Sequence, residues 1–139
     1  MISHNQKIHI LRLHPGQDLK RVLFDFVQSK QIGAAAIVAA VGSLSKAQLR
    51  LASAQKSVEW AGPFEVVSLS GTLAMEGLHL HISLADASGV VCGGHLLDGC
   101  LVHTTCELVI QQYLDLEFHR QVDSSTGYKE LSISERRKL

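Results

Sequence analysis

The chain has 139 residues, and its 13 basic Lys and Arg residues equal its 13 acidic Asp and Glu residues, so the formal net charge is zero. Hydrophobic residues make up 46% and charged residues 19% of the composition, which excludes a generally disordered chain. The charge balance lacks the basic excess that proteins binding nucleic-acid phosphates normally show. We expect one domain over residues 1–139, with a charged tail that frays from about residue 134.

The cysteine pattern and the N-terminal sequence indicate the compartment. Cys92, Cys100 and Cys106 include no Cys-x-x-Cys pair, and their odd number argues against a disulfide framework. The first residues show no basic run followed by an apolar stretch, so no signal peptide is evident. The longest apolar stretch, 33–42, is about half of what a membrane span requires. We expect a cytoplasmic protein with reduced, buried cysteines and no membrane association.

In the first half of the chain, apolar spacing predicts one helix among several strands. Asp18 is a favourable N-cap, and apolar residues recur at helical spacing from Leu19 until Gly33, which is expected to end the helix. Around this helix the sequence predicts strands over 7–13, 34–40 and 44–52, a bend at 41–43 and a looser surface segment over 54–62.

The second half of the chain is rich in strand patterns. The four apolar residues from Leu78 to Leu84 alternate strictly with polar ones, which makes this the clearest strand in the sequence. Gly71 is expected to be a weak point or bulge in the strand before it. In chain order the sequence predicts strands over 64–74 and 78–84, a turn over 86–89, a return strand from residue 90, a long strand over 101–114, a turn over 123–127 and a short strand over 128–133. One helix among antiparallel strands indicates an α+β fold.

Several segments, in the same order, resemble the plants-and-prokaryotes conserved (PPC) domain family. They are Leu13-His14-Pro15-Gly16-Gln17-Asp18-Leu19, Val41-Gly42-Ser43-Leu44-Ser45, the run from Gly62 to Thr72, the run from Leu78 to Asp86 and the run from Gly89 to Val102. The resemblance covers about residues 8–114. It implies a homotrimer built on a curved, mostly antiparallel sheet with one main helix packed on it, a fold similar to that of acetolactate decarboxylase.

The same resemblance implies an association with DNA. In plant relatives the domain follows an AT-hook, a short basic peptide that enters the minor groove, and stand-alone prokaryotic members carry a DNA-binding description by analogy. This sequence contains no Arg-Gly pair, so it lacks the core of an AT-hook. DNA therefore stays a candidate partner that neither a motif nor the net charge supports.

Three histidines are candidates for a common face of the sheet. Residues two apart in a strand point to the same side, so His79 and His81 project together, opposite the apolar side chains of their strand. The position of His95 depends on the turn before it. A four-residue loop over 86–89 would place His95 on the other face, whereas a five-residue loop, or a bulge at Gly93-Gly94, would pair it with His81.

A cluster of His79, His81 and His95 would form a half-open site for zinc or another divalent metal. Three imidazoles leave a fourth position for water or substrate, and an ion held this way polarises a substrate oxygen or activates water. The resembled fold is shared by acetolactate decarboxylase and by a zinc-binding ester hydrolase family, which hold metal through a His-x-His pair and a later histidine. The carboxylates that could complete the site are Glu65, Glu76 and Glu107. Glu65 is preferred as the catalytic candidate because it belongs to the family motif.

The alternative is a structural role without metal, in which these histidines form hydrogen bonds at a trimer interface or line a solvent-filled groove. Three functions remain open at this point: a trimeric DNA-associated or assembly module, a small metal-dependent enzyme acting on a carbonyl or ester substrate, and a protein-interaction module with neither activity. The histidines without an evident partner are His4, His9, His14 and His119.

Overall fold

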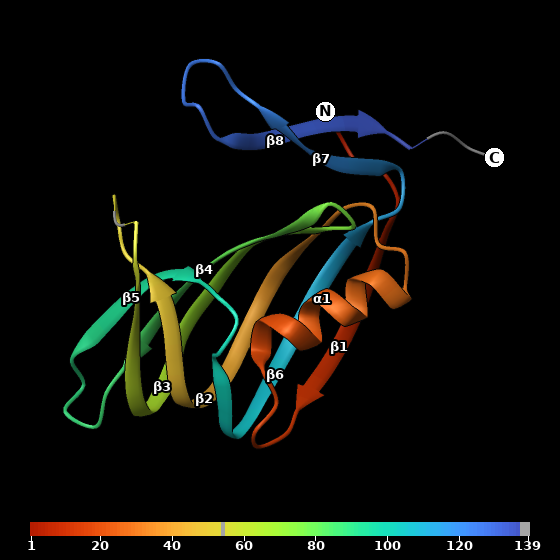
Figure 1. The fold of residues 1–139 in the computed structure, drawn as a ribbon. Helices are drawn as coiled ribbons and strands as arrows, with labels where there is room; N and C mark the ends of the chain where they lie inside the picture. The colour runs from red at the N-terminus through yellow and green to blue at the C-terminus, as the bar shows by residue number, and fades with distance from the viewer. Residues whose placement is uncertain (54, 137–139) are drawn as a thin grey trace.

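The structure is a computed structural model that describes residues 1–53 and 55–136, and within these ranges it contains one helix and two antiparallel sheets (Figure 1). The elements are β1 (Gln6–Leu13), α1 (Leu19–Ser29), β2 (Ala35–Arg50), β3 (Ser57–Ala74), β4 (Gly77–Ala85), β5 (Val91–Leu96), β6 (Leu101–Tyr113), β7 (Leu116–Val122) and β8 (Lys129–Glu135). The larger sheet has the strand order β1-β6-β2-β3-β4-β5, and β7 pairs with β8 in a separate hairpin. Because β5 also pairs with the end of β2, strands β2 to β5 close on themselves and the sheet curls strongly. The antiparallel α+β fold predicted from the sequence is confirmed.

Helix α1 begins where the sequence predicts and ends earlier. The Asp18 carboxylate caps it by accepting a hydrogen bond from the Arg21 backbone N–H at 3.1 Å. The helix buries one apolar face, which consists of Leu19, Leu23 and Val27. It ends at Ser29 rather than near Gly33, because Gln31 takes a positive φ of 50° that turns the chain. No helix in the described ranges is long and apolar enough to cross a membrane.

Two segments predicted to be irregular belong to long strands. The expected bend at 41–43 lies in the middle of β2, which stays paired with β6 on both sides of it, and the register shifts between Gly42 and Leu44. A Cβ atom at Gly42 would overlap the Thr105 backbone, so glycine lets β2 and β6 approach this closely. The expected loose segment around Trp60 belongs to β3 from Ser57 on, where it pairs with β2. Pairing with a strand distant in the sequence therefore overrides the weak local pattern.

The irregularity expected at Gly71 lies elsewhere in β3. The register between β3 and β4 shifts between Val66 and Ser68, and it is regular at Gly71. Gly71 instead has a φ of 138°, and a Cβ atom there would overlap the His79 carbonyl oxygen. Glycine at this position thus allows close pairing of β3 with the histidine-bearing part of β4.

The C-terminal hairpin contains a strand that the sequence pattern did not reveal. Leu116 and Phe118 of β7 are buried in a small apolar cluster with Ala34 and Ala74. Two apolar residues are too short an alternation to predict a strand from the sequence. Strand β8 continues to Glu135, so the chain is paired beyond the point where fraying was expected. The rest of the expected tail, 137–139, lies outside the described residues.

The main core is apolar and contains two of the three cysteines. Cys100 and Cys106 are buried, Cys92 is half-buried, and all three are free thiols. Burial raises the pKa of both Cys100 and Cys106 to about 11. These thiols therefore stay protonated and pack in the core, as the sequence predicted, and the Cys100 thiol also donates a hydrogen bond to the Gln48 carbonyl at 3.3 Å.

Candidate metal centre

Strand β4 separates an apolar face from a histidine face. Leu80 and Ile82 are only 1% and 2% exposed, whereas His79 and His81 lie on the exposed side of the strand. Because alternate residues of a strand point to opposite faces, burial of the apolar residues fixes the side on which the two imidazoles project.

The turn between β4 and β5 decides the position of His95. Ala85 pairs with Val91, which leaves a five-residue loop, and the regular register that follows pairs His81 with His95. Of the two alternatives, the longer loop is therefore the one present, and no bulge occurs at the paired glycines. Gly94 serves a different purpose: a Cβ atom there would lie 2.7 Å from the Arg50 carbonyl oxygen, so glycine permits β2 to approach β5 beside His95.

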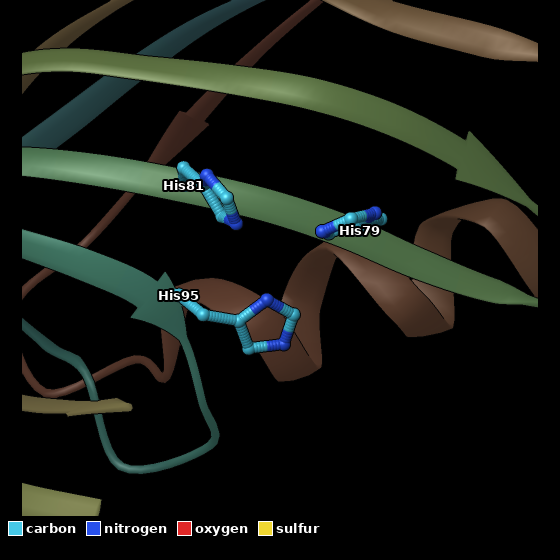
Figure 2. Close-up of side chains that lie close together, drawn as sticks. All are labelled: His79, His81 and His95. Atoms are coloured by element: carbon cyan, nitrogen blue, oxygen red, sulfur yellow. The ribbon is translucent and has the colours of Figure 1, made fainter. Parts of the chain in front are cut away.

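The structure brings His79, His81 and His95 together as one cluster, here called the histidine triad (Figure 2). The ring centroids lie 5.1 Å apart for His79 and His81, 5.3 Å for His79 and His95, and 5.6 Å for His81 and His95. One ring nitrogen from each residue lies within 4.8 Å of the other two. The Nδ1 atom of His95 is buried and has no hydrogen-bond partner in the described part of the chain.

The surroundings keep two of the imidazoles neutral. Desolvation, followed by the nearby Arg120 charge, lowers the pKa of His79. Desolvation and then the Arg50 charge lower the pKa of His95 to about 4. Neutral imidazole is the form that binds a metal ion, so these two side chains are in a ligating state at neutral pH.

The triad fits a divalent transition metal. Zn–N bonds of 2.0–2.1 Å require ligand nitrogens roughly 3.4 Å apart, so nitrogens within 4.8 Å need only small side-chain rotations. A buried polar atom without a partner costs about 1–3 kcal/mol, and ligation of a metal by His95 Nδ1 would remove that cost. Three imidazoles are also the donor set of open, catalytic zinc sites.

A cavity of about 920 Å³ opens over the triad, between the sheet and the C-terminal hairpin. Glu76 and Glu130 are the carboxylates on its wall. Glu65, the catalytic candidate from the sequence, is exposed on β3 opposite Ala85, at the end of β4 away from His79. Neither Glu65 nor Glu107 lines the cavity. Glu65 was preferred because it belongs to the family motif, but within this chain it does not lie at the triad.

Glu76 connects the β3–β4 turn to the hairpin. Its Oε1 atom lies 2.8 Å from His119 Nδ1, and its Oε2 atom accepts a hydrogen bond from the Arg120 backbone N–H at 2.8 Å. The other ring nitrogen of His119 lies 2.9 Å from Ser134 Oγ. The hydrogen bond from His119 is the main cause of a lowered Glu76 pKa. His119, which had no evident partner in the sequence, is thus part of a structural tether.

The sequence analysis missed the two arginines on the cavity wall. Arg50 lies at the end of β2, where it pairs with His95. Arg120 lies on β7, and its Nη2 atom donates to Thr72 Oγ1 at 2.6 Å. A basic residue at the end of the strand predicted over 44–52 was visible in the sequence, but the strand that carries Arg120 was not.

Known proteins of similar sequence and structure support a family assignment. A segment of the bifunctional protein GlmU from Synechococcus sp. strain JA-3-3Ab is 46% identical over 127 residues, which are 91% of this chain and 20% of that protein. The chain thus spans about a fifth of the length of this relative. A solved hypothetical protein from Salmonella cholerae-suis is 44% identical with a TM-score of 0.96, covering 99% of both chains.

Two more solved structures extend the comparison. The metal-containing protein AF0104 from Archaeoglobus fulgidus is 30% identical with a TM-score of 0.80, covering 91% of this chain and 93% of its own. Alpha-acetolactate decarboxylase from Bacillus subtilis strain 168 shares the fold at a lower level, with a TM-score of 0.53 and 19% identity over 75% of this chain and 51% of the enzyme.

The sequence pattern of the Plants and Prokaryotes Conserved (PCC) domain matches residues 2–114. This range contains the whole larger sheet, helix α1 and the histidine triad, and it ends before the C-terminal hairpin. The chain therefore belongs to the Plants and Prokaryotes Conserved domain family.

Proposed function

We propose that the chain binds one divalent metal ion, zinc in the first place, through His79, His81 and His95. The convergence of three imidazole nitrogens within 4.8 Å is the observation that carries this proposal. The buried, unpartnered Nδ1 of His95 supports it, because that atom lacks any other use in the described chain. Further support comes from AF0104, a family relative described as metal-containing, which is 30% identical to this chain.

We further propose that the site is catalytic and acts on a small carbonyl or ester substrate. The triad lies at the wall of a cavity of about 920 Å³, which is the size of small-molecule sites in general. A metal with open positions there would act as a Lewis acid on a substrate oxygen. The lowered pKa values of His79 and His95 keep those residues neutral, and the apolar face of β4 holds the imidazoles in place.

Metal content of the purified protein tests the proposal. The protein would be produced without a histidine tag, supplied with zinc, passed through a desalting column and measured by elemental analysis. We expect about one zinc per chain, and a large loss of zinc in His81→Ala and in His95→Ala. His103→Ala is the matched control, because His103 is an exposed histidine on β6 outside the cavity.

The proposal is contradicted if the unaltered protein leaves the column without metal. It is equally contradicted if His81→Ala and His95→Ala retain as much zinc as His103→Ala. Circular dichroism spectra that match the unaltered protein ensure that any loss of metal reflects the lost ligand rather than unfolding.

We also propose that copies of the chain assemble as a homotrimer through the outer face of the larger sheet. This face carries apolar side chains that are unusually exposed: Ile8 at 53%, Ile10 at 79%, Val38 at 55% and Val41 at 65%. They come from β1 and β2, which flank β6 on the side opposite the core. Contiguous exposed apolar residues are typical of a protein interface, and the resemblance to the family implies a trimer.

A further inference from the structure

The C-terminal hairpin forms one wall of the cavity although it lies outside the matched family range of 2–114. Arg120 of β7 and Lys129 and Glu130 of β8 all line the cavity that contains the histidine triad. The hairpin therefore adds to the family's shared sheet a set of charged groups that the shared part does not contain.

Arg120 is held so that its guanidinium lies beside the triad. Its Nη2 atom donates to Thr72 Oγ1 at 2.6 Å, and Thr72 is the strand neighbour of His79. The backbone of Arg120 is fixed separately, through the hydrogen bond from its N–H to Glu76 Oε2 at 2.8 Å. Since the other oxygen of Glu76 lies 2.8 Å from His119 Nδ1, the Glu76 carboxylate is occupied and does not pair with the Arg120 side chain.

Arg50 lies on the opposite side of the triad. It is the strand neighbour of His95, and Gly94 permits the close approach of its backbone. Neither Arg50 nor Arg120 takes part in an ion pair within the described ranges. Two arginines thus line one cavity, and no carboxylate in the described ranges pairs with either of them.

The charges of the cavity favour a negative ligand. Arg50, Arg120 and Lys129 contribute positive charge, while Glu76 and Glu130 contribute negative charge. Glu76 is already engaged by His119 and the β7 backbone. Glu130, the other carboxylate of the wall, accepts a hydrogen bond from Thr126 Oγ1 at 3.0 Å. A divalent ion on the triad would add further positive charge. A guanidinium group binds carboxylates and phosphates through two parallel hydrogen bonds, so this arrangement suits an oxyanion.

We propose that the cavity binds a small organic anion, whose carboxylate or phosphate group is anchored by Arg120 and assisted by Arg50, with the rest of the ligand directed to the triad. The C-terminal hairpin is then the specificity element of the site. This inference rests on the proposed metal function for what happens at the triad, whereas anion binding itself depends on the two arginines.

Calorimetric titration with defined probes tests the inference. Succinate, inorganic phosphate and the neutral succinamide would be titrated at low ionic strength into the zinc-supplied protein and into protein stripped with a chelator. We expect one of the two anions to bind and succinamide not to bind. Binding of succinate assigns the anchor to a carboxylate, and binding of phosphate assigns it to a phosphate group.

Variants then locate the anchor. Arg120→Gln is expected to weaken anion binding by about tenfold or more, since it removes hydrogen bonds to a charged group, and to keep its zinc. Arg50→Gln should also weaken anion binding. Because Arg50 lies on β2, this effect would not depend on the hairpin. Arg21→Gln, on the exposed surface of helix α1, is the matched control and should bind as the unaltered protein does.

The outcomes separate this inference from the proposed function. Zinc present without anion binding, or equal anion binding in Arg120→Gln and Arg21→Gln, overturns the anion site and leaves the metal site standing. Anion binding that depends on Arg120, in a protein that retains no zinc after zinc supply and desalting, supports the anion site and removes the metal site. Equal melting temperatures of the three variants show that the hairpin and the sheet remain folded.

Discussion

Glu76 shows how a single side chain joins the two sheets of the molecule. It lies in the β3–β4 turn, and its two oxygens contact His119 and the Arg120 backbone on β7. The sequence suggested Glu76 only as a site carboxylate. In the structure Glu76 lines the cavity, and its carboxylate also holds the strand that carries Arg120.

The lowered pKa of Glu76 predicts how this tether responds to pH. The hydrogen bond from His119 is the largest cause of the shift, and the bond from the Arg120 backbone is the next. A carboxyl whose folded-state pKa is depressed contributes its stabilisation fully above its ordinary pKa of 4.5 and loses it as the pH falls through the lower folded value. We expect the Arg120 amide resonance to shift toward its untethered position over this acidic range, below pH 4.5.

An NMR titration of the Arg120 backbone amide measures this response. The Glu76→Gln variant supplies the reference, because it cannot ionise and its Arg120 amide should not titrate in the same range. An amide that titrates identically in both proteins would show that Glu76 is not the group that holds β7.

At the scale of elements, β4 carries the core and the site on opposite faces. Leu80 is 1% exposed and lies between His79 and His81 in sequence. Truncating a side chain should therefore affect the stability differently on the two faces. A truncation on the apolar face removes packed volume, whereas a truncation on the histidine face removes an exposed ring.

We expect Leu80→Ala to lower the free energy of unfolding of the metal-free protein by about 2–5 kcal/mol. His79→Ala should change it by no more than about 0.5 kcal/mol, as exposed substitutions usually do. Urea unfolding followed by circular dichroism measures both. Similar losses in the two variants would mean that the histidine face is packed rather than open.

How far the sequence predicts the fold differs from element to element. The alternation of β4 and the Asp18 cap are local patterns, so they were predictable. The Gly93-Gly94 pair left the face of His95 open, because loop length is set by hydrogen bonds within the turn, such as the Asp86 N–H to the Val90 carbonyl at 3.0 Å. Strand β7 and the approach of Arg120 to the triad arise from contacts between distant segments, which no local pattern contains.

For the whole molecule, the exposed apolar face of β1 and β2 is the surface proposed above for assembly. Ile10, at 79% exposed, is its most exposed side chain among those of β1 and β2. In the homotrimer proposed above, this side chain would be covered by a second copy. DNA association stays a prediction of the family resemblance. The net charge does not support it, since basic and acidic residues are equal at 13 each.

We expect light scattering after gel filtration to give about three times the chain mass of 15.1 kDa, a trimer as the family resemblance implies. Ile10→Asp should shift the protein toward the monomer, because burying an unpaired carboxylate opposes association. Lys7→Asp, a change of charge at an exposed position near the start of β1, is the control. A monomer in the unaltered protein, or a trimer in Ile10→Asp, would contradict the proposed interface.

The central claim is that one metal ion is held by the three histidines of β4 and β5. A crystal of the zinc-supplied protein, measured with X-rays just above the zinc absorption edge, tests it directly through the anomalous signal. The account predicts one strong peak per chain at about 2.0–2.1 Å from ring nitrogens of His79, His81 and His95. No peak at the triad, or a peak bound by other side chains while the three rings remain free, would contradict it.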